Sequence, residues 1–409
     1  MPPRIAILAL MISACATQTQ AVRPPEGQVV PGVEVLLRDS LDLLRGKRVG
    51  LITNASGRDR KGTSTIDLLF HAPDVKLVAL FGPEHGLRGV AEAGVAVASD
   101  VDSATGVPIY SLFGEITTPT PAMLAPLDVL VYDIQDVGAR VYTYQWTMVL
   151  AAAAAKKAGK PFIVLDRPNP IRADRFEGNV LRPAFASFVG LQPVPLRYGF
   201  TPGELLRYLV GKRLINADVT VVPMSGYRRS MWWEETGIPW INPSPNLRGM
   251  DAVILYPGTV MFEGTSASEG RGTEDPFRIV GASWLTDAAA IADELNAKHL
   301  AGVRFAATTR AIVPTARKFA GQTIPMIEIT ITGRNKVNGA EVGVHMLRAM
   351  YRRHPAEFTW RLPQIDRLAG TDELRKAVEQ EGGVERLLEQ WRKEAAAFEI
   401  EARPFLIYH

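Results

Sequence analysis

The sequence predicts an α/β protein: an open, doubly wound and mainly parallel sheet, followed by a second, smaller α+β domain. Three observations predict this fold. Short apolar runs alternate with helical patterns as far as about residue 255. Polar residues gather directly after several of these runs, which is where such sheets bind their ligands. Beyond residue 255 the pattern of apolar and polar residues changes, and amphipathic helical patterns dominate.

The composition excludes several classes of protein. The chain has 409 residues, of which 47% are hydrophobic and 22% charged, values too apolar for a disordered chain and ordinary for two globular domains. A formal net charge of +3 gives no electrostatic signal for a nucleic-acid partner. The single cysteine excludes an internal disulfide and a thiolate zinc site, and none of the six histidines is spaced as in a zinc helix. We therefore expect no metal and no cofactor.

The first residues have the pattern of a bacterial lipoprotein leader. Arg4 precedes an apolar run from Ile5 to Ile12, which is too short for a permanent transmembrane helix. The run ends in ISAC at residues 12–15, which resembles a lipobox. The alternative is an ordinary signal peptide that contains a cysteine by chance.

This leader predicts where the protein resides. We expect residues 1–14 to be a cleaved signal peptide, Cys15 to be lipidated, and residues 15–31 to form a polar tether. The protein is then exported and attached to the membrane through its lipid anchor only, at the periplasmic face of the outer membrane.

The first domain is predicted to span residues 32–255. Short, continuously apolar runs are typical of parallel strands that are buried on both faces. They are Arg48–Thr53, Val75–Phe81, Val129–Tyr132, Pro161–Leu165, Val219–Val222 and Ala252–Tyr256. Helical patterns lie between them at Tyr144–Ala158 and Pro202–Val210, the second preceded by Thr201 as its N-cap.

The second domain is predicted to span residues 256–409. Helices are expected at Asp287–His299, Gly343–Arg353 and Asp372–Phe398, and a strand at Met326–Thr332.

Polar side chains follow four consecutive predicted strands. They are Asn54 after the first, Glu84 and His85 after the second, Asp133, Gln135, Asp136 and Arg140 after the third, and Asp166 and Asn169 after the fourth. The carboxyl ends of parallel strands meet at one edge of a sheet, so we expect a ligand crevice there. Each residue alone can be a turn or a cap, and Asp136 with Arg140 can be an ion pair. The four loops together favour a binding site.

The crevice offers carboxylates, a histidine, amides and arginine, whereas the G-x-S-x-G, phosphate-loop and G-x-G-x-x-G motifs are missing from the sequence. Two carboxyl groups, one of them kept protonated, are the groups that hydrolyse glycosides. Glu84 suits the role of the acid, because it lies in a turn with Gly82, Pro83 and Gly86 after a buried strand. Such a turn limits the access of water to the carboxyl group and so favours its protonated form. The alternative is an exposed glutamate of a turn.

Several sequence blocks contain most of these polar residues. They are GPEHGLRG (82–89), YDIQDVGARVYTY (132–144), LDRPNPI (165–171), INPSPN (241–246) and FEGTSASEGRGTEDPF (262–277). In this order they resemble the NamZ family of bacterial exo-β-N-acetylmuramidases, and the resemblance extends from about Gly32 to the C-terminus. It implies a Rossmann-like N-terminal domain, a smaller C-terminal domain, and an active site in the cleft between them.

The resemblance also implies the reaction, which is release of N-acetylmuramic acid from the non-reducing end of peptidoglycan fragments. The partners are then peptidoglycan-derived muramyl saccharides. The general acid of the family carries over to Glu84. The second carboxyl group stays open between Glu177, Glu263 and Glu269.

Substrate binding is expected from polar side chains of the crevice and of these blocks. They are Asn54, His85, Asp133, Gln135, Arg140, Tyr144, Asn169, Asn242, Asn246 and Arg271. Arg271 or Arg140 suits the lactyl carboxylate of muramic acid, because a planar guanidinium binds a carboxylate bidentately; an interdomain ion pair is the alternative for Arg271. The tryptophans of residues 230–240 suit either sugar stacking or the core.

Two other functions fit the same residues. A metal-dependent hydrolase would use His85, Asp133, Asp136 and Asp166, because oxygen ligands and one imidazole can hold a divalent ion. A glycan-binding lipoprotein without catalysis would use the same crevice.

Overall fold

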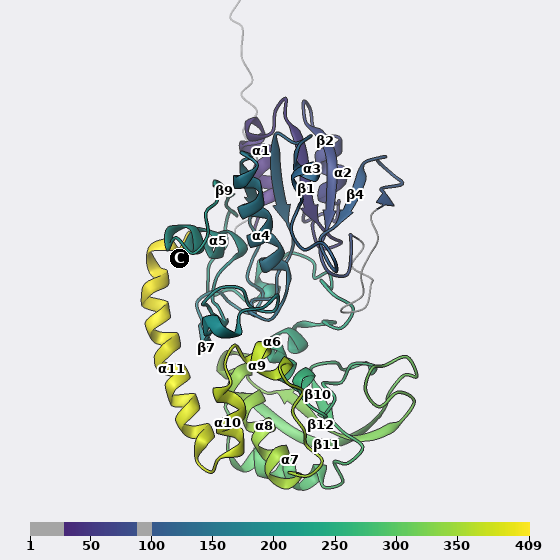
Figure 1. The fold of residues 1–409 in the computed structure, drawn as a ribbon, viewed down its shortest axis with the longest axis vertical. Helices are drawn as coiled ribbons and strands as arrows, with labels where there is room; N and C mark the ends of the chain where they lie inside the picture. Colours follow the sequence, from purple (N-terminus) through teal and green to yellow (C-terminus); the bar gives the residue numbers. More distant parts are fainter. Residues whose placement is uncertain (1–27, 88–99) are drawn as a thin grey trace, which may run out of the picture.

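The computed structural model describes residues 28–87 and 100–409, which form two lobes (Figure 1). The predicted signal peptide, Cys15 and most of the tether lie outside the described residues, as does the end of the block 82–89. Within the described ranges, no helix combines the length and the apolar character needed to span a bilayer.

The first lobe contains a seven-stranded sheet with the order β3-β4-β2-β1-β5-β6-β9. Its strands are β1 (Arg48–Thr53), β2 (Lys76–Gly82), β3 (Asp100–Val101), β4 (Pro108–Ser111), β5 (Val129–Asp133), β6 (Phe162–Leu165) and β9 (Val219–Val222). The short strand β3 is antiparallel to β4, and the other pairs are parallel. The predicted mainly parallel sheet is confirmed, and so are its expected strands up to Val222.

Helices cover both faces of this sheet, as a doubly wound fold requires. They are α1 (Gly32–Asp39) and α2 (Thr65–Phe70) on one face, and α4 (Tyr144–Lys157) and α5 (Pro202–Gly211) on the other, where the short α3 (Pro121–Leu124) also packs. Leu51 and Val131 pack in the core under α1, whereas their neighbours Ile52 and Tyr132 pack in the core under α4. Successive strand residues thus fill two separate cores.

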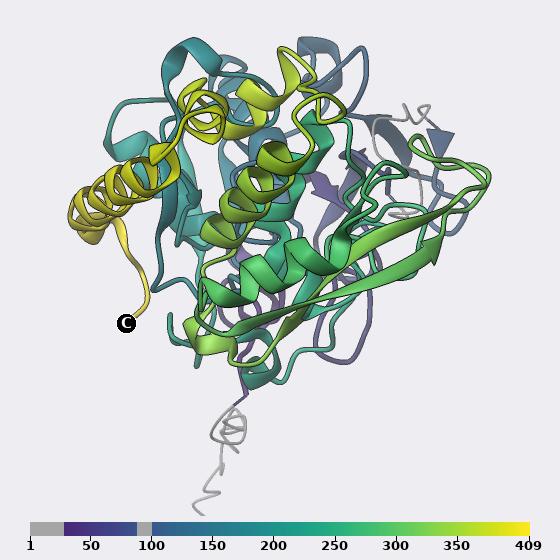
Figure 2. The ribbon, with the colours of Figure 1, turned by 90° about the horizontal axis from the view of Figure 1, so that it is seen from below.

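The second lobe contains a three-stranded antiparallel sheet with the order β10-β12-β11. Its strands are β10 (Ile279–Gly281), β11 (Val303–Ala311) and β12 (Thr323–Ile331), and its helices are α6 (Met250–Thr259), α7 (Ala288–Ala297), α8 (Gly339–Arg353), α9 (Gln364–Ala369) and α10 (Glu373–Glu379). Figure 2 shows the long β11–β12 hairpin with α7 and α8 beside it. A further antiparallel pair, β7 (Glu177–Val180) with β8 (Pro195–Arg197), belongs to the first half of the chain.

The predicted strand Ala252–Tyr256 is wrong, because these residues form part of helix α6. Every residue from Ala252 to Thr259 is buried, and a run that is apolar on all sides fits a buried helix as well as a buried strand. The helix packs tightly on α8: a Cβ atom on Gly258 would lie 1.9 Å from the carbonyl oxygen of Gly339. The boundary predicted near residue 255 therefore falls inside a helix.

The predicted long helix Asp372–Phe398 is also corrected. The chain forms α10, leaves the helix after Glu379, and starts again as α11 (Gly383–Ala402). Gly382 has φ +62° at this break, a left-handed conformation that glycine adopts without strain.

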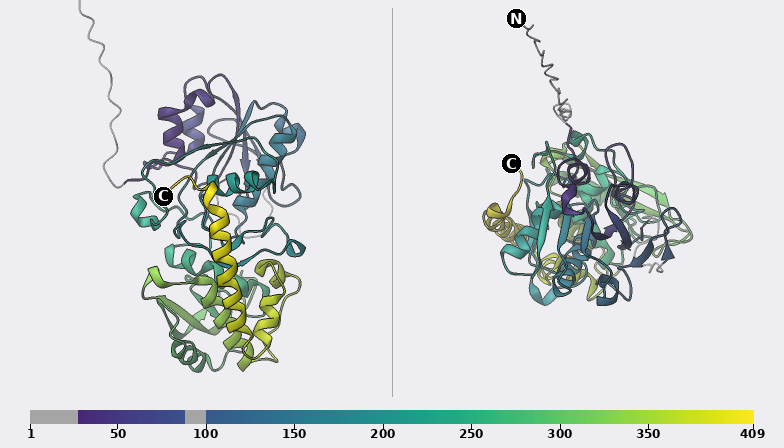
Figure 3. Two further views of the ribbon diagram at one scale, coloured as in Figure 1. Left: turned by 90° about the vertical axis from the view of Figure 1, so that its left-hand side faces the viewer. Right: turned by 90° about the horizontal axis from the view of Figure 1, so that it is seen from above.

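Helix α11 returns from the second lobe to the first, where the last residues of the chain dock (Figure 3). The Tyr408 hydroxyl donates to Asp166 at 2.7 Å, and the backbone N–H of Ile407 donates to Glu204 at 2.9 Å. Tyr408 is buried in a cluster with Val29, the second residue of the described chain. We call residues 383–409 the C-terminal strap.

Candidate active site

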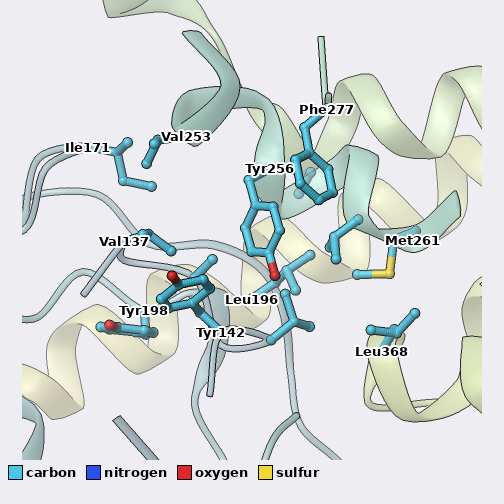
Figure 4. Close-up of a cluster of buried hydrophobic side chains, with 14 of the residues drawn as sticks. Val137, Tyr142, Ile171, Leu196, Tyr198, Val253, Tyr256, Met261, Phe277 and Leu368 are labelled. Atoms are coloured by element: carbon cyan, nitrogen blue, oxygen red, sulfur yellow. The ribbon is translucent and has the colours of Figure 1, made fainter. Parts of the chain in front are cut away.

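A cavity of about 90 Å³ lies between the two lobes. The first lobe lines it with Glu84, His85, Tyr142, Thr143, Ser244 and Asn246, and the second with Tyr256, Glu263, Arg271, Phe277 and Leu368. Figure 4 shows Tyr256 between Tyr142 and Phe277, and the ring centroids lie 6.0 Å apart for Tyr256 and Tyr142 and 4.8 Å apart for Tyr256 and Phe277. We call this space the interlobe cavity.

Glu84 reaches the interlobe cavity from the turn that follows β2. His85 and Gly86 have φ of +70° and +73°, and the Gly86 N–H closes the turn on the carbonyl of Pro83 at 2.9 Å. A left-handed histidine is uncommon and is kept only where the surroundings fix it, so this turn holds Glu84 in one orientation.

Thr143 holds the carboxyl group of Glu84. Its hydroxyl donates to Oε2 of Glu84 at 2.7 Å, and Thr143 itself is the N-cap residue of α4. The contact joins the end of β2 to the start of α4, segments that are 59 residues apart. Sequence reasoning missed Thr143, although its position directly before a predicted helix was a signal.

The opposite wall carries two glutamates that share one arginine. Nη1 of Arg271 lies 2.6 Å from Glu263 and 3.5 Å from Glu269, and Lys318 lies 3.1 Å from the other oxygen of Glu269. The guanidinium of Arg271 also stands over the ring of Phe277, 5.0 Å from its centre.

The two glutamates differ in their electrostatic surroundings. Burial and the neighbouring charge of Glu269 raise the pKa of Glu263, although Arg271 acts in the opposite direction. Burial also disfavours the charge of Glu269, but Lys318 and Arg271 together outweigh it and lower the pKa of Glu269. Glu263 lines the cavity, whereas the side chain of Glu269 is only 6% exposed and bound to its cations. Of the two, Glu263 is thus the carboxyl group that lines the same cavity as Glu84.

The third candidate, Glu177, is not part of this cavity. It lies on β7, where it binds Arg197 at 2.6 Å, in a different hollow beside Trp391 of α11. The structure therefore does not bring Glu177 together with Glu84.

Arg140, a predicted ligand for the lactyl carboxylate, is fully buried away from the cavity. Its Nη1 donates to the carbonyls of Asn179 and Val194 at 2.8 and 3.0 Å. Its Nη2 donates to those of Leu368 and Ala369 in the second lobe at 3.4 and 2.7 Å. The prediction that Arg140 binds the lactyl carboxylate is therefore wrong. Both terminal nitrogens of its guanidinium are bonded to backbone carbonyls, which join the two lobes. The alternative ion pair between Asp136 and Arg140 is not formed either.

Most of the other predicted residues stabilise the sheet edge. Asp133 is bound by Arg167 and by the Thr65 hydroxyl, and Gln135 donates to the carbonyl of Pro168 at 2.7 Å. Asn169 and Asn54 accept hydrogen bonds from the backbone N–H groups two residues further on, at 3.1 and 2.9 Å.

The remaining predicted residues lie in and beside the cavity. His85 and Asn246 line it. The Tyr144 hydroxyl donates to the carbonyl of Pro243 beside it, and Asn242 accepts from the indole N–H of Trp240 at 3.0 Å. Sequence reasoning missed Tyr142, Ser244, Tyr256 and Phe277, because their approach depends on how the two lobes pack.

The residues of the metal-dependent alternative are not arranged as a metal site. In residues 28–87 and 100–409, no group of three or more histidine, cysteine, aspartate or glutamate side chains is placed to hold a metal ion. Asp133 is paired with Arg167, and Asp166 is bonded to the hydroxyls of Thr201 and Tyr408.

Asp136 should make the stability of the fold depend on pH. Burial raises its pKa from 3.8 to about 7, and its Oδ1 has no hydrogen-bond partner among the described residues. Since the folded state then binds the proton more tightly than the unfolded state, this group's contribution weakens as pH rises from about 4 to 7. Over that range, the wild type should lose about 1.4 kcal/mol of unfolding free energy per pH unit relative to Asp136→Asn. Urea unfolding at a series of pH values measures the unfolding free energy of both proteins. The prediction is contradicted if this free energy changes equally with pH in the wild type and in Asp136→Asn.

Comparison with known proteins gives the family. Residues 49–251 match the model described as "Exo-beta-N-acetylmuramidase NamZ, N-terminal", and residues 254–408 match its C-terminal counterpart. The chain is 41% identical over 393 residues to the peptidoglycan beta-N-acetylmuramidase NamZ of Bacillus subtilis (strain 168), covering 96% of this chain and 94% of the relative.

Two solved structures of DUF1343 family proteins from Bacteroides fragilis NCTC 9343 are also similar. The first has a TM-score of 0.87 and 36% identity, with 94% of this chain and 100% of that chain covered. The second has a TM-score of 0.74 and 29% identity, with 93% and 99% covered. With both family models matched along most of its length, the chain belongs to the exo-β-N-acetylmuramidase NamZ family.

Proposed function

We propose that the protein hydrolyses peptidoglycan fragments from their non-reducing end and releases N-acetylmuramic acid, with Glu84 as the general acid. The observation that supports this most strongly is the pairing of carboxyl groups across the interlobe cavity. Glu84 projects from the first lobe, and Glu263 lies on the wall formed by the second. The similarity to the peptidoglycan beta-N-acetylmuramidase of Bacillus subtilis supports the same class of reaction.

In this mechanism the leaving oxygen of the glycosidic bond takes a proton from Glu84. The Thr143 hydroxyl donates a hydrogen bond to Oε2 of Glu84 and so helps to orient the carboxyl group. Glu263 assists the attack at the anomeric carbon from the other wall of the cavity. Water supplies the hydroxyl group of the released muramic acid, and Glu84 regains its proton when the reaction is complete.

Arg271 is the guanidinium proposed to recognise the lactyl group of muramic acid. It lines the cavity, its side chain is 28% exposed, and it holds Glu263 in place. A bound lactyl carboxylate would share the arginine with Glu263, so substrate binding and the position of the second carboxyl group are linked.

The function is tested with a disaccharide of N-acetylmuramic acid and N-acetylglucosamine that has muramic acid at its non-reducing end. The purified protein should release free N-acetylmuramic acid in the presence of a chelator, and chromatography of the products measures it. Binding of the disaccharide without turnover would support the glycan-binding alternative. Loss of turnover with chelator would support a metal-dependent hydrolase.

Replacing Arg271 by alanine should weaken the preference for a muramic acid glycoside over its glucosamine counterpart. The two substrates differ by the lactyl ether and its charge, and a hydrogen bond to a charged group is worth about 1.5–3 kcal/mol. The ratio of kcat/KM values should therefore fall by about ten- to a hundredfold. Arg271→Lys keeps the charge but loses the planar fork, so it should give an intermediate ratio. Equal losses on both glycosides would show that Arg271 only positions Glu263.

A further inference from the structure

A second hollow of about 580 Å³ lies between the lobes. Trp233, Ile238 and Trp240 line it from the first lobe, and Met250, Pro276 and Arg278 line it from the second. We call it the indole pocket.

The indole pocket adjoins the interlobe cavity. Ser244, Asn246 and Leu247 line the cavity, and the chain then continues through Arg248 to Ala252, which line the indole pocket. A second segment is shared in the same way, since Phe277 lines the cavity while its neighbours Pro276 and Arg278 line the pocket. Two short chain segments thus border both spaces, so the pocket lies next to the cavity.

The walls of the pocket suit a saccharide. The rings of Trp233 and Trp240 stand nearly perpendicular, at 79°, with centroids 5.1 Å apart, so each fixes the other. Trp240 is half-buried, and its Nε1 is tied to Asn242, which leaves its ring as an oriented apolar surface at the pocket. Nε1 of Trp233 is buried and lacks a hydrogen-bond acceptor among the described residues. An aromatic surface with the polar side chains of Asp251 and Glu274 at the same pocket matches the mixed apolar and hydroxylic faces of a sugar ring.

The charges around the pocket favour an uncharged ligand. Its rim carries the carboxylates of Glu234, Asp251, Glu274 and Asp275 against the guanidinium groups of Arg248 and Arg278. Glu234 is already paired with Arg334 at 2.9 Å, and Asp275 with Arg278 at 3.1 Å. The exposed Asp251 and Glu274 remain as acceptors for hydroxyl groups, and they would repel the carboxylates of a stem peptide.

We propose that the indole pocket binds an uncharged N-acetylhexosamine on the leaving-group side of the substrate. This inference rests on the proposed function, because the muramyl residue must occupy the interlobe cavity for the next sugar to reach the pocket. The pocket then contributes to the affinity for saccharides that extend beyond the bond that is cleaved.

The test compares two substrates in the wild type and in Trp240→Ala. One is the muramic acid–glucosamine disaccharide, and the other is a muramyl fluoride, whose leaving group is a single atom that cannot reach the pocket. Trp240→Ala should lower kcat/KM on the disaccharide by about tenfold and leave the fluoride unchanged. Trp360→Ala, which removes another half-buried indole outside both spaces, is the matched control and should leave both substrates unchanged.

Other results of this comparison would overturn either the proposal for the pocket or the proposed function. Unchanged hydrolysis of the disaccharide, or equal losses on both substrates, would overturn the proposal for the pocket. If the wild type hydrolyses neither substrate, the proposed function itself fails.

Discussion

Replacing Glu84 by glutamine should lower the rate of hydrolysis of the muramic acid–glucosamine disaccharide by about 10²–10⁴-fold, the usual contribution of a general acid. Glutamine keeps the shape of the side chain and can still accept the hydrogen bond from Thr143, but it has no proton to give to the leaving oxygen. The loss should be largest in kcat, because the variant still binds the substrate. Initial rates over a range of disaccharide concentrations measure it.

A second substrate separates this role from a structural one. A muramic acid glycoside with a good leaving group needs less protonation, so its glycosylation step should be less affected by Glu84→Gln. Glu357→Gln, an exposed glutamate of the second lobe, is the matched control and should behave as the wild type. Near wild-type rates for Glu84→Gln on the disaccharide would show that the acid is another carboxyl group, with Glu263 the first to be tested.

Replacing Arg140 by leucine should reduce the unfolding free energy by about 3–5 kcal/mol. The variant leaves the carbonyls of Asn179, Val194, Leu368 and Ala369 without their donor, and each buried polar group left unpaired costs about 1–3 kcal/mol before relaxation. Burial lowers the pKa of Arg140 to about 9, yet the four acceptors around it fit only a donor. Unfolding in urea measures the change.

Arg182 provides the control for Arg140. It lies nearby, but its side chain is 34% exposed and pairs with Glu394 at 2.5 Å. A partly exposed ion pair contributes about 1 kcal/mol or less, so Arg182→Leu should be tolerated. If the two leucine variants lose equal stability, the carbonyl contacts of Arg140 do not hold the lobes together.

The fold could be predicted where local pattern decides the structure. Parallel strands buried on both faces give short apolar runs, and these located β1, β2, β5, β6 and β9. The same rule failed at Ala252–Tyr256, because a helix buried on all sides gives an apolar run of the same kind. What separates the two cases is the close contact of Gly258 with α8, which no local pattern contains.

Only part of the candidate site could be predicted from the sequence. The turn after β2 located Glu84, since the end of a parallel strand and a rigid turn are both visible in the sequence. Arg140 follows a strand in the same way, but an arginine that binds carbonyls has the same local pattern as one that binds a substrate. Contacts across the lobes, such as that of Tyr142 with Tyr256, depend on residues more than a hundred positions apart.

The C-terminal strap has a consequence for how the lobes can move. The chain passes from the first lobe to the second at α6 and returns along α11, whose end is fixed to the first lobe by Tyr408. The second lobe is therefore attached to the first at both of its ends, in addition to the contacts that Arg140 makes with Leu368 and Ala369. A chain without the strap would keep only the connection at α6 and the contacts between the lobes, so the walls that carry Glu84 and Glu263 would be held less firmly against each other.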